Sequence, residues 1–188
     1  RNFLFSSSCS VYGASGEVNE NTELNPLSPY GTTKFSAEMI INDFALNFDI
    51  SIIVLRYFNV IGNSDFNLAF DTSKECLVPS IYYALERESL PKIFGNDFDT
   101  PDGTALRDYI DVRDLSYAHF LAVEYLIQNK KKLSLTLNVG KGKPSSVLDI
   151  INAFQKIICW NFAYEIGDKN DSDPSKVWAN NDKFKKLF

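Results

Sequence analysis

The chain has 188 residues, of which 45% are apolar and 23% are charged, and its net charge is −5 at pH 7. This balance is typical of a globular domain with enough apolar material for a core, and it argues against a disordered chain. The longest basic run, 130–132, predicts a solvated helix end rather than a nucleic-acid-binding face. No apolar run is long enough to span a bilayer, so we expect neither nucleic acid nor membrane as a partner.

The cysteines and the histidine argue against metal chemistry. Cys9, Cys76 and Cys159 are widely spaced and form no CxxC pair, which predicts free thiols in a reducing cytoplasm. The single histidine, His119, lies inside a helical pattern with no second ligand nearby. We therefore expect no bound metal.

The first third of the chain alternates strand and helix patterns. Residues 1–5 predict a strand that leads into three serines, so the chain is expected to begin inside a sheet. A polar loop is expected over 14–28, and Pro29 then suits the first turn of a helix. That helix carries apolar residues at three- and four-residue steps: Phe35, Met39, Ile40, Phe44 and Phe48. The apolar run 51–56 predicts a buried parallel strand.

The rest of the chain continues the alternation after an irregular stretch over 59–75. The expected elements are a helix at 79–88, a strand at 92–94, an acidic loop at 96–103, a helix at 112–128, a strand at 135–139, a helix from the Ser146 cap to 158, a strand at 162–166 and a final amphipathic segment. Such alternation predicts an α/β fold with a mostly parallel sheet.

One group of residues carries a chemical signal. Tyr30 and Lys34 are four residues apart and share one face of the expected helix, and Ser8 ends the strand before it. An ammonium beside a phenol favours the phenolate and should lower its pKa from about 10. Together, these three groups could take a proton from a hydroxyl while hydride leaves the same carbon. An ordinary amphipathic helix is the alternative, because a Tyr-x-x-x-Lys pattern alone is weak.

These residues also carry a family resemblance that extends along nearly the whole chain. It resembles the UDP-galactose 4-epimerases of the extended short-chain dehydrogenase family in these segments: FSSSCSVYG (5–13), SPYGTTK (28–34), LRYFN (55–59), IFGNDF (93–98), DGTALRDYI (102–110), NVG (138–140), SVLD (146–149) and VWAN (177–180). The resemblance implies part of a Rossmann-type doubly wound parallel sheet with a smaller C-terminal substrate-binding α/β region. The implied division is 1–62 and 63–188, with about 108–139 packing back on the sheet.

The resemblance implies reversible epimerisation at C4 of UDP-glucose and UDP-galactose through a 4-keto sugar, with tightly bound NAD. Tyr30 would accept the proton of the 4-hydroxyl, helped by Lys34 and Ser8, and all three would also contact the cofactor. Phe58 would contact its nicotinamide. The implied substrate contacts are Asn59, Leu77, Phe94, Arg107 for the diphosphate and Val177 at the sugar 2-substituent. A salt bridge from Arg107 to Asp108 or Asp111 is the alternative for that arginine.

Several departures from the family pattern bear on these expectations. A glycine-rich dinucleotide-binding loop is not among the 188 residues, so this chain alone is expected to hold NAD weakly. Cys76 stands where the family has an asparagine that helps to hold the UDP, and Asn170 where it has an arginine. Val177 leaves room for N-acetylated sugars. Cys9 and Ser10 supply no carboxylate after Ser8, which disfavours the dehydratases of the same family.

Two alternatives to an epimerase remain. The chain could be a non-catalytic remnant that keeps the fold but not NAD binding, and sequence before Arg1 would discriminate the two. Another NAD-dependent sugar-nucleotide enzyme, such as a 4-reductase, is disfavoured by the segments over 93–110. Relatives of this kind dimerise through a bundle that includes the helix with Tyr30, so we expect a homodimer of the full-length form.

Overall fold

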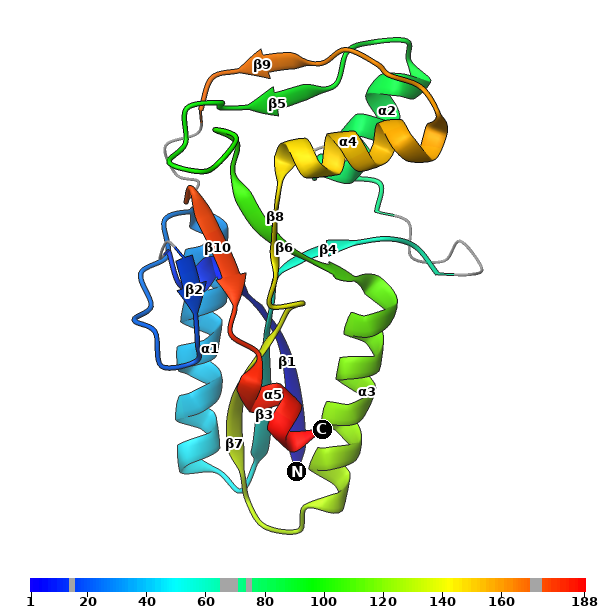
Figure 1. Ribbon diagram of the computed structural model, residues 1–188. Coiled ribbons are helices and arrows are strands. Elements are labelled where there is room, and N and C mark those ends of the chain that lie inside the picture. The colour runs from blue at the N-terminus through cyan, green and yellow to red at the C-terminus, as the bar shows by residue number, and fades with distance from the viewer. Residues whose placement is uncertain (14–15, 65–70, 74–75, 170–173) are drawn as a thin grey trace.

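A computed structural model describes residues 1–13, 16–64, 71–73, 76–169 and 174–188. Figure 1 shows a lower part built around a parallel sheet and an upper part of two helices and two short strands. A twisted strand, β6 (Leu106–Asp111), runs between the two parts. Both termini lie in the lower part of the molecule.

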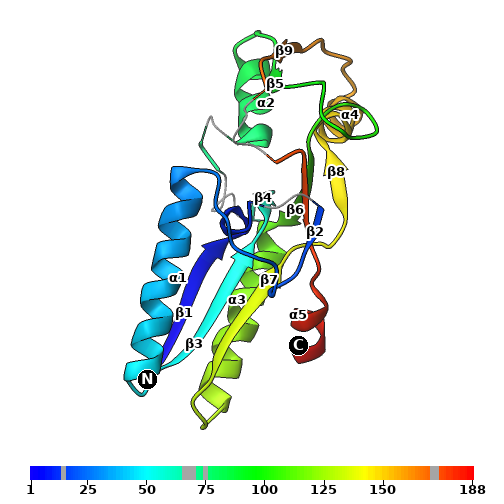
Figure 2. The ribbon, with the colours of Figure 1, turned by 90° about the vertical axis from the view of Figure 1, so that its left-hand side faces the viewer.

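The main sheet consists of β1 (Asn2–Ser8), β3 (Ser51–Tyr57) and β7 (Ser134–Val139), all parallel, in the order β1-β3-β7. Ser8 is in register with Tyr57, and Tyr57 with Val139, so the three strands end together. The helices α1 (Pro29–Asn47) and α3 (Val112–Gln128) both contact β1 and β3, and the two views place them on opposite faces of the sheet (Figures 1 and 2).

Apolar side chains from β3, β7 and α3 form the largest core cluster. Its buried members are Ile53, Leu55, Ile110, Leu115, Ala118, Ala122, Leu126, Leu137 and Val139. The strand β3 is buried along almost its whole length because helices cover both of its faces. The short α5 (Asp182–Leu187) contacts β7 and contributes Phe184 and Leu187 to the same cluster.

A second sheet lies beside the carboxyl ends of the first. It contains β2 (Gly16–Val18), β10 (Lys176–Ala179), β6 (Leu106–Asp111) and β4 (Asn59–Ile61), all parallel, and β8 (Pro144–Ser146), antiparallel to β6. This sheet joins segments from the beginning, middle and end of the chain. A single-turn 3₁₀ helix, η1 (Cys9–Val11), leads from β1 towards it.

The upper part combines α2 (Leu77–Glu86), α4 (Val147–Ile158) and the parallel pair β5 (Lys92–Phe94) and β9 (Glu165–Gly167). Its core is a separate apolar cluster of Ile81, Ile93, Ile151 and Phe162. The expected cap of α4 is present as a reciprocal capping box, in which Ser146 and Asp149 each accept the other's backbone N–H.

The predicted α/β class with parallel strands is confirmed, and so are the long helices. The strands β2, β4, β6, β8 and β10 were not predicted, because their pairing depends on distant segments and all of them except β6 have only three or four residues. The helix predicted at 79–88 is α2, which begins at Leu77 and ends at Glu86. The strand predicted at 162–166 begins only at Glu165. The proposed division at residue 62 stays a prediction.

Within the described part of the chain, no helix is long and apolar enough to cross a membrane. The same residues contain no cluster of three or more His, Cys, Asp or Glu side chains that could hold a metal ion.

Candidate active site

Ser8 lies at the carboxyl end of β1, where the chain turns into η1. Its Oγ caps that turn by accepting from the backbone N–H of Ser10 at 3.2 Å, and it lies 2.9 Å from the hydroxyl of Ser10. Ser8 is only 7% exposed. The local geometry therefore fixes this hydroxyl in place.

Tyr30 lies in the first turn of α1, whose start is set by local sequence. Ser28 caps the helix by accepting from the N–H of Gly31 at 3.1 Å, and Pro29 occupies the first turn. A Cβ on Gly31 would lie 2.6 Å from the carbonyl oxygen of Ser10. Only glycine therefore allows α1 to approach the loop that follows Ser8 this closely.

Lys34 lies one turn further along α1 and reaches the same region. Its Nζ donates to the carbonyl oxygen of Ser6 at 2.9 Å and lies 5.7 Å from the centroid of the Tyr30 ring. The hydroxyl of Ser8 is near enough to the Tyr30 phenol to act on its pKa. The structure thus brings the three predicted catalytic side chains together at the carboxyl ends of β1 and β3, the edge where open parallel sheets bind ligands.

The expected lowering of the Tyr30 pKa is wrong for this structure. Burial and the nearby Tyr57 raise the pKa of Tyr30, and these effects outweigh the hydrogen bond from Ser8, which lowers it. The ammonium of Lys34 is bound to the Ser6 carbonyl rather than to the phenol oxygen. Proximity of the two side chains alone does not make the phenol acidic.

Two predicted contact residues belong to the core beside the site. Phe58 and Val177 are 3% and 6% exposed and lie in one cluster with Val11, Tyr12, Val18 and Ala179. Asn59, which follows Phe58, is exposed at the start of β4. The predicted roles of all three residues stay predictions.

Arg107 lies on β6 and is in register with Val177 on β10. Burial raises the pKa of the Cys9 thiol to about 12, although the positive charge of the nearby Arg107 acts to lower it. The carboxylate of Asp108 accepts three backbone N–H groups, at 2.8, 2.9 and 3.1 Å. Asp111 pairs with Arg113 at 2.8 Å. Asp108 and Asp111, the two carboxylates expected as alternative partners of Arg107, thus accept hydrogen bonds from other donors.

The other predicted substrate contacts come from the upper part of the molecule. Leu77 begins α2 and packs against the cluster around Ile81. Phe94 on β5 is 58% exposed, and the Nζ of Lys92 lies 5.5 Å from its ring centroid. Both elements lie beyond the carboxyl ends of β1 and β3 (Figure 1). Asn170 lies outside the described residues.

Sequence reasoning missed the charged residues behind the site. Arg56 is 5% exposed within β3, and its guanidinium pairs with Glu38 of α1 at 2.6 Å. Hydrogen bonds with Glu38 and Tyr12 raise the pKa of Arg56, although burial acts in the opposite direction. An arginine inside an otherwise apolar strand was the available signal, because a buried charge requires a partner.

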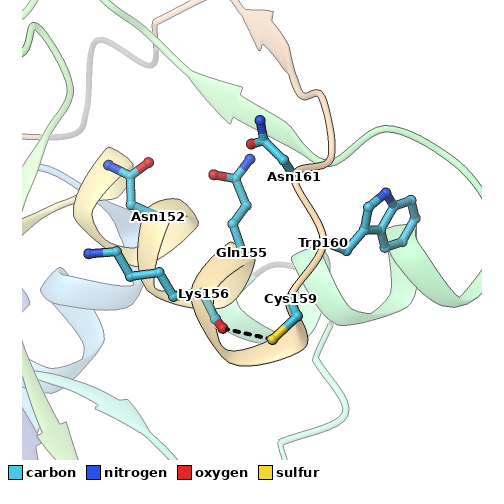
Figure 3. A pocket seen from close by; sticks show the side chains of 6 residues that line it. All are labelled: Asn152, Gln155, Lys156, Cys159, Trp160 and Asn161. Carbon is cyan, nitrogen blue, oxygen red and sulfur yellow. Dashed lines mark hydrogen bonds between the residues drawn. The ribbon is translucent and has the colours of Figure 1, made fainter.

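A surface hollow of about 530 Å³ lies elsewhere, at the carboxyl end of α4. It is lined by Asn152, Gln155, Lys156, Cys159, Trp160 and Asn161 (Figure 3). Gln155 donates to the carbonyl oxygen of Phe162 at 2.7 Å, and the Sγ of Cys159 donates to the carbonyl oxygen of Lys156 at 3.7 Å. None of the predicted site residues lines this hollow.

Curated relatives match the chain over nearly its full length. It is 35% identical over 192 residues to a UDP-glucose 4-epimerase from Rhizobium meliloti (strain 1021), covering 99% of this chain and 58% of that protein. It is 38% identical over 188 residues to a UDP-glucose 4-epimerase from Erwinia amylovora, covering 94% and 54%. The chain therefore spans less than two thirds of the length of these relatives.

Solved structures give the same result. A UDP-glucose 4-epimerase from Brucella ovis in complex with NAD superposes with a TM-score of 0.89 at 32% identity, over 100% of this chain and 59% of that one. A UDP-glucose 4-epimerase from Stenotrophomonas maltophila with bound NAD and formylated UDP-arabinopyranose gives 0.87 at 32% identity, over 100% and 57%. The model of the NAD dependent epimerase/dehydratase family matches residues 1–140. The expected resemblance to 4-epimerases is thus confirmed, and the chain belongs to the NAD dependent epimerase/dehydratase family.

Proposed function

We propose that this chain supplies the proton-transfer and sugar-nucleotide-binding part of an NAD-dependent UDP-hexose 4-epimerase. Its substrates are UDP-glucose and UDP-galactose, interconverted through a 4-keto sugar. The observation that carries the proposal is the meeting of Ser8, Tyr30 and Lys34 at the carboxyl ends of two parallel strands. The similarity to UDP-glucose 4-epimerases along the chain supports the same conclusion.

The three side chains have distinct roles in this proposal. Tyr30 is 52% exposed, so its phenol oxygen is accessible to a sugar hydroxyl, and the phenolate form of Tyr30 accepts the proton of that hydroxyl. Ser8 hydrogen-bonds the same sugar oxygen and, near the phenol, acts to lower the pKa of Tyr30. Lys34, fixed by the Ser6 carbonyl, lies beside the Tyr30 ring, and its positive charge stabilises the phenolate that then accepts the sugar proton. NAD, when bound, accepts and returns the hydride of C4.

The residues of this chain fit one end of NAD better than the other. An ammonium has three donors, and the Ser6 carbonyl takes one donor of Lys34, so this side chain suits the ribose hydroxyls near the nicotinamide. Phe58 is the proposed nicotinamide contact. The diphosphate of a dinucleotide needs a glycine-rich turn before a helix, and the 188 residues include no such fingerprint. We therefore expect weak retention of NAD by this chain alone.

A chimera tests the function directly. The N-terminal part of the Rhizobium meliloti relative that this chain does not match is joined before Arg1, and conversion of UDP-galactose to UDP-glucose is measured with NAD. We expect turnover that Tyr30→Phe lowers by roughly 10²–10⁴-fold, because the proton acceptor is lost. Tyr82→Phe, at an exposed position of α2, is the matched control. A folded chimera that binds NAD without turnover would favour the remnant hypothesis.

The substrate contacts complete the proposal. Arg107 binds the diphosphate, because its planar guanidinium matches phosphate oxygens, and Asn59, Leu77 and Phe94 contact the UDP-sugar. Val177 sets the space for the 2-substituent, so N-acetylated sugars are also substrates. In the chimera, Val177→Tyr should reduce turnover of UDP-N-acetylgalactosamine more than that of UDP-galactose. Equal losses for both substrates would contradict the role of Val177.

We also infer a cytoplasmic homodimer of the full-length form. The face of α1 that points away from the sheet exposes several large apolar side chains: Met39 at 51%, Ile40 at 58% and Phe44 at 54%. Unpaired apolar helix faces of this size favour association. Light scattering on the chimera should give twice the monomer mass, and Ile40→Glu should halve it. Ile127→Glu, on the exposed side of α3, is the control.

A further inference from the structure

A buried carboxylate ties the helix that carries Tyr30 and Lys34 to the strand that carries Ser8. Glu38 lies one turn after Lys34 on α1 and is 2% exposed. It accepts hydrogen bonds from Arg56 Nε at 3.0 Å and Nη2 at 2.6 Å, and from the hydroxyl of Ser7. Ser7 directly precedes Ser8 in β1, so one side chain joins α1, β1 and β3 beside the candidate site.

The same network continues into the second sheet. Arg56 Nη1 donates to the hydroxyl of Tyr12 at 3.1 Å, and that hydroxyl donates to Oδ1 of Asn138 at 2.6 Å. Asn138 Nδ2 donates to the carbonyl oxygens of Val18 at 2.9 Å and Asn180 at 3.3 Å. Val18 ends β2 and Asn180 follows β10, so the chain of contacts reaches the sheet that carries the proposed substrate residues.

Apolar packing gives α1 only limited positional information of its own. Its buried residues are Gly31, Glu38 and Ala45, and Phe35 packs partly buried against the cluster around Val11 and Tyr12. Small and partly buried side chains restrict the sliding of a helix less than a row of large interlocking side chains does. Charge-assisted hydrogen bonds are directional, and a bidentate arginine–carboxylate pair has a defined geometry. The ion pair is therefore the feature that can fix α1 in one position.

We propose that Glu38 is a positioning residue, which sets α1 against β1 so that the phenol of Tyr30 meets the hydroxyl of Ser8. The proposal rests on the proposed function for its consequence, since misplaced groups would lose proton transfer. Its physical content is independent of turnover. Loss of the Glu38 carboxylate should uncouple Tyr30 from Ser8 in the chain itself.

A double-mutant cycle in which the pKa of the Tyr30 phenol is measured tests this proposal. The chain has nine tyrosines, so ¹³Cζ-tyrosine labelling resolves them by NMR, and Tyr30→Phe assigns the signal of Tyr30. Losing the Ser8 hydroxyl by Ser8→Ala should raise the pKa of Tyr30, because that hydroxyl acts to lower it. In the Glu38→Gln background, the same substitution should have little effect, because the contact is already lost.

Two further variants separate positioning from general destabilisation. Ser7→Ala removes one donor to Glu38 but keeps the ion pair. It should therefore also reduce the change in the Tyr30 pKa that Ser8→Ala causes. This variant provides the test if Glu38→Gln fails to fold. Ile151→Ala weakens the remote cluster around α4 and should leave that shift unchanged. An undiminished Ser8→Ala shift in both the Glu38 and Ser7 variants would overturn the proposal. The titration needs no substrate, so failure of the chimera to epimerise would be a separate result.

Discussion

The buried pair of Glu38 and Arg56 allows a quantitative prediction about stability. Glu38→Leu leaves the guanidinium of Arg56, 5% exposed, without its carboxylate. Removing one partner of a buried ion pair costs about 3–5 kcal/mol of the free energy of unfolding, because the remaining charge stays buried. Urea denaturation followed by circular dichroism, with linear extrapolation, measures this loss.

The double variant Glu38→Leu/Arg56→Met should recover most of that loss. Replacing both charged groups by apolar side chains removes the stranded charge, and such replacements are often neutral or stabilising. The hydroxyl of Ser7, 0% exposed, then lacks its acceptor, which costs about 1–3 kcal/mol. Adding Ser7→Ala should remove this remaining loss. A double variant less stable than Glu38→Leu alone would refute the reasoning, because the electrostatic penalty would not be the dominant cost.

Three further predictions concern other residues of the lower part of the molecule. Burial raises the pKa values of Tyr12 and Tyr109 to about 12, so each tyrosine contributes stability below pH 10 that is lost as the pH rises through 12. For Tyr12, the shift of about two units is about 3 kcal/mol, and Tyr12→Phe should reduce the fall in the urea midpoint between pH 9 and 11.5. Gly13 has φ +59°, and a Cβ there would lie 1.7 Å from a carbonyl oxygen, so Gly13→Ala should cost more than about 2 kcal/mol by thermal denaturation. Gly16→Ala is the control: Gly16 has φ +107°, but a Cβ there would have no atom within 4 Å, so this substitution measures the cost of backbone strain without a clash. Asp108→Asn should cost about 1–3 kcal/mol by urea denaturation, because one oxygen that accepts backbone N–H groups becomes an amide donor.

The parts of the fold that the sequence predicts are those with local signals. Pro29 and the Ser28 cap fix the start of α1, and the Ser146 capping box fixes the start of α4. The apolar run of β3 is long enough to identify a buried strand. These signals come from residues close together in the chain, and each was sufficient for its element.

The second sheet could not be predicted in this way. Its strand β2 is three residues long and pairs with β10, which lies at the other end of the chain. The register of Arg107 with Val177 is likewise a contact between distant segments. Strand formation at such positions depends on the partner rather than on local propensity. The grouping of Ser8, Tyr30 and Lys34 was predictable, because α1 lies between the paired parallel strands β1 and β3 in the chain and packs on both.

The helix α1 shows how a correct helix prediction can still misjudge what faces the core. Its apolar residues were expected partly to cover the sheet, yet Met39, Ile40 and Phe44 are all more than half exposed, whereas Glu38 is buried. Apolar periodicity identifies a stripe but not its partner, and here the sheet offers Arg56, whose burial requires a carboxylate. In our proposal the ion pair sets which side of α1 faces β1, and the apolar stripe then lies on the exposed side. One buried arginine thus links the placement of Tyr30 to the proposed dimer face.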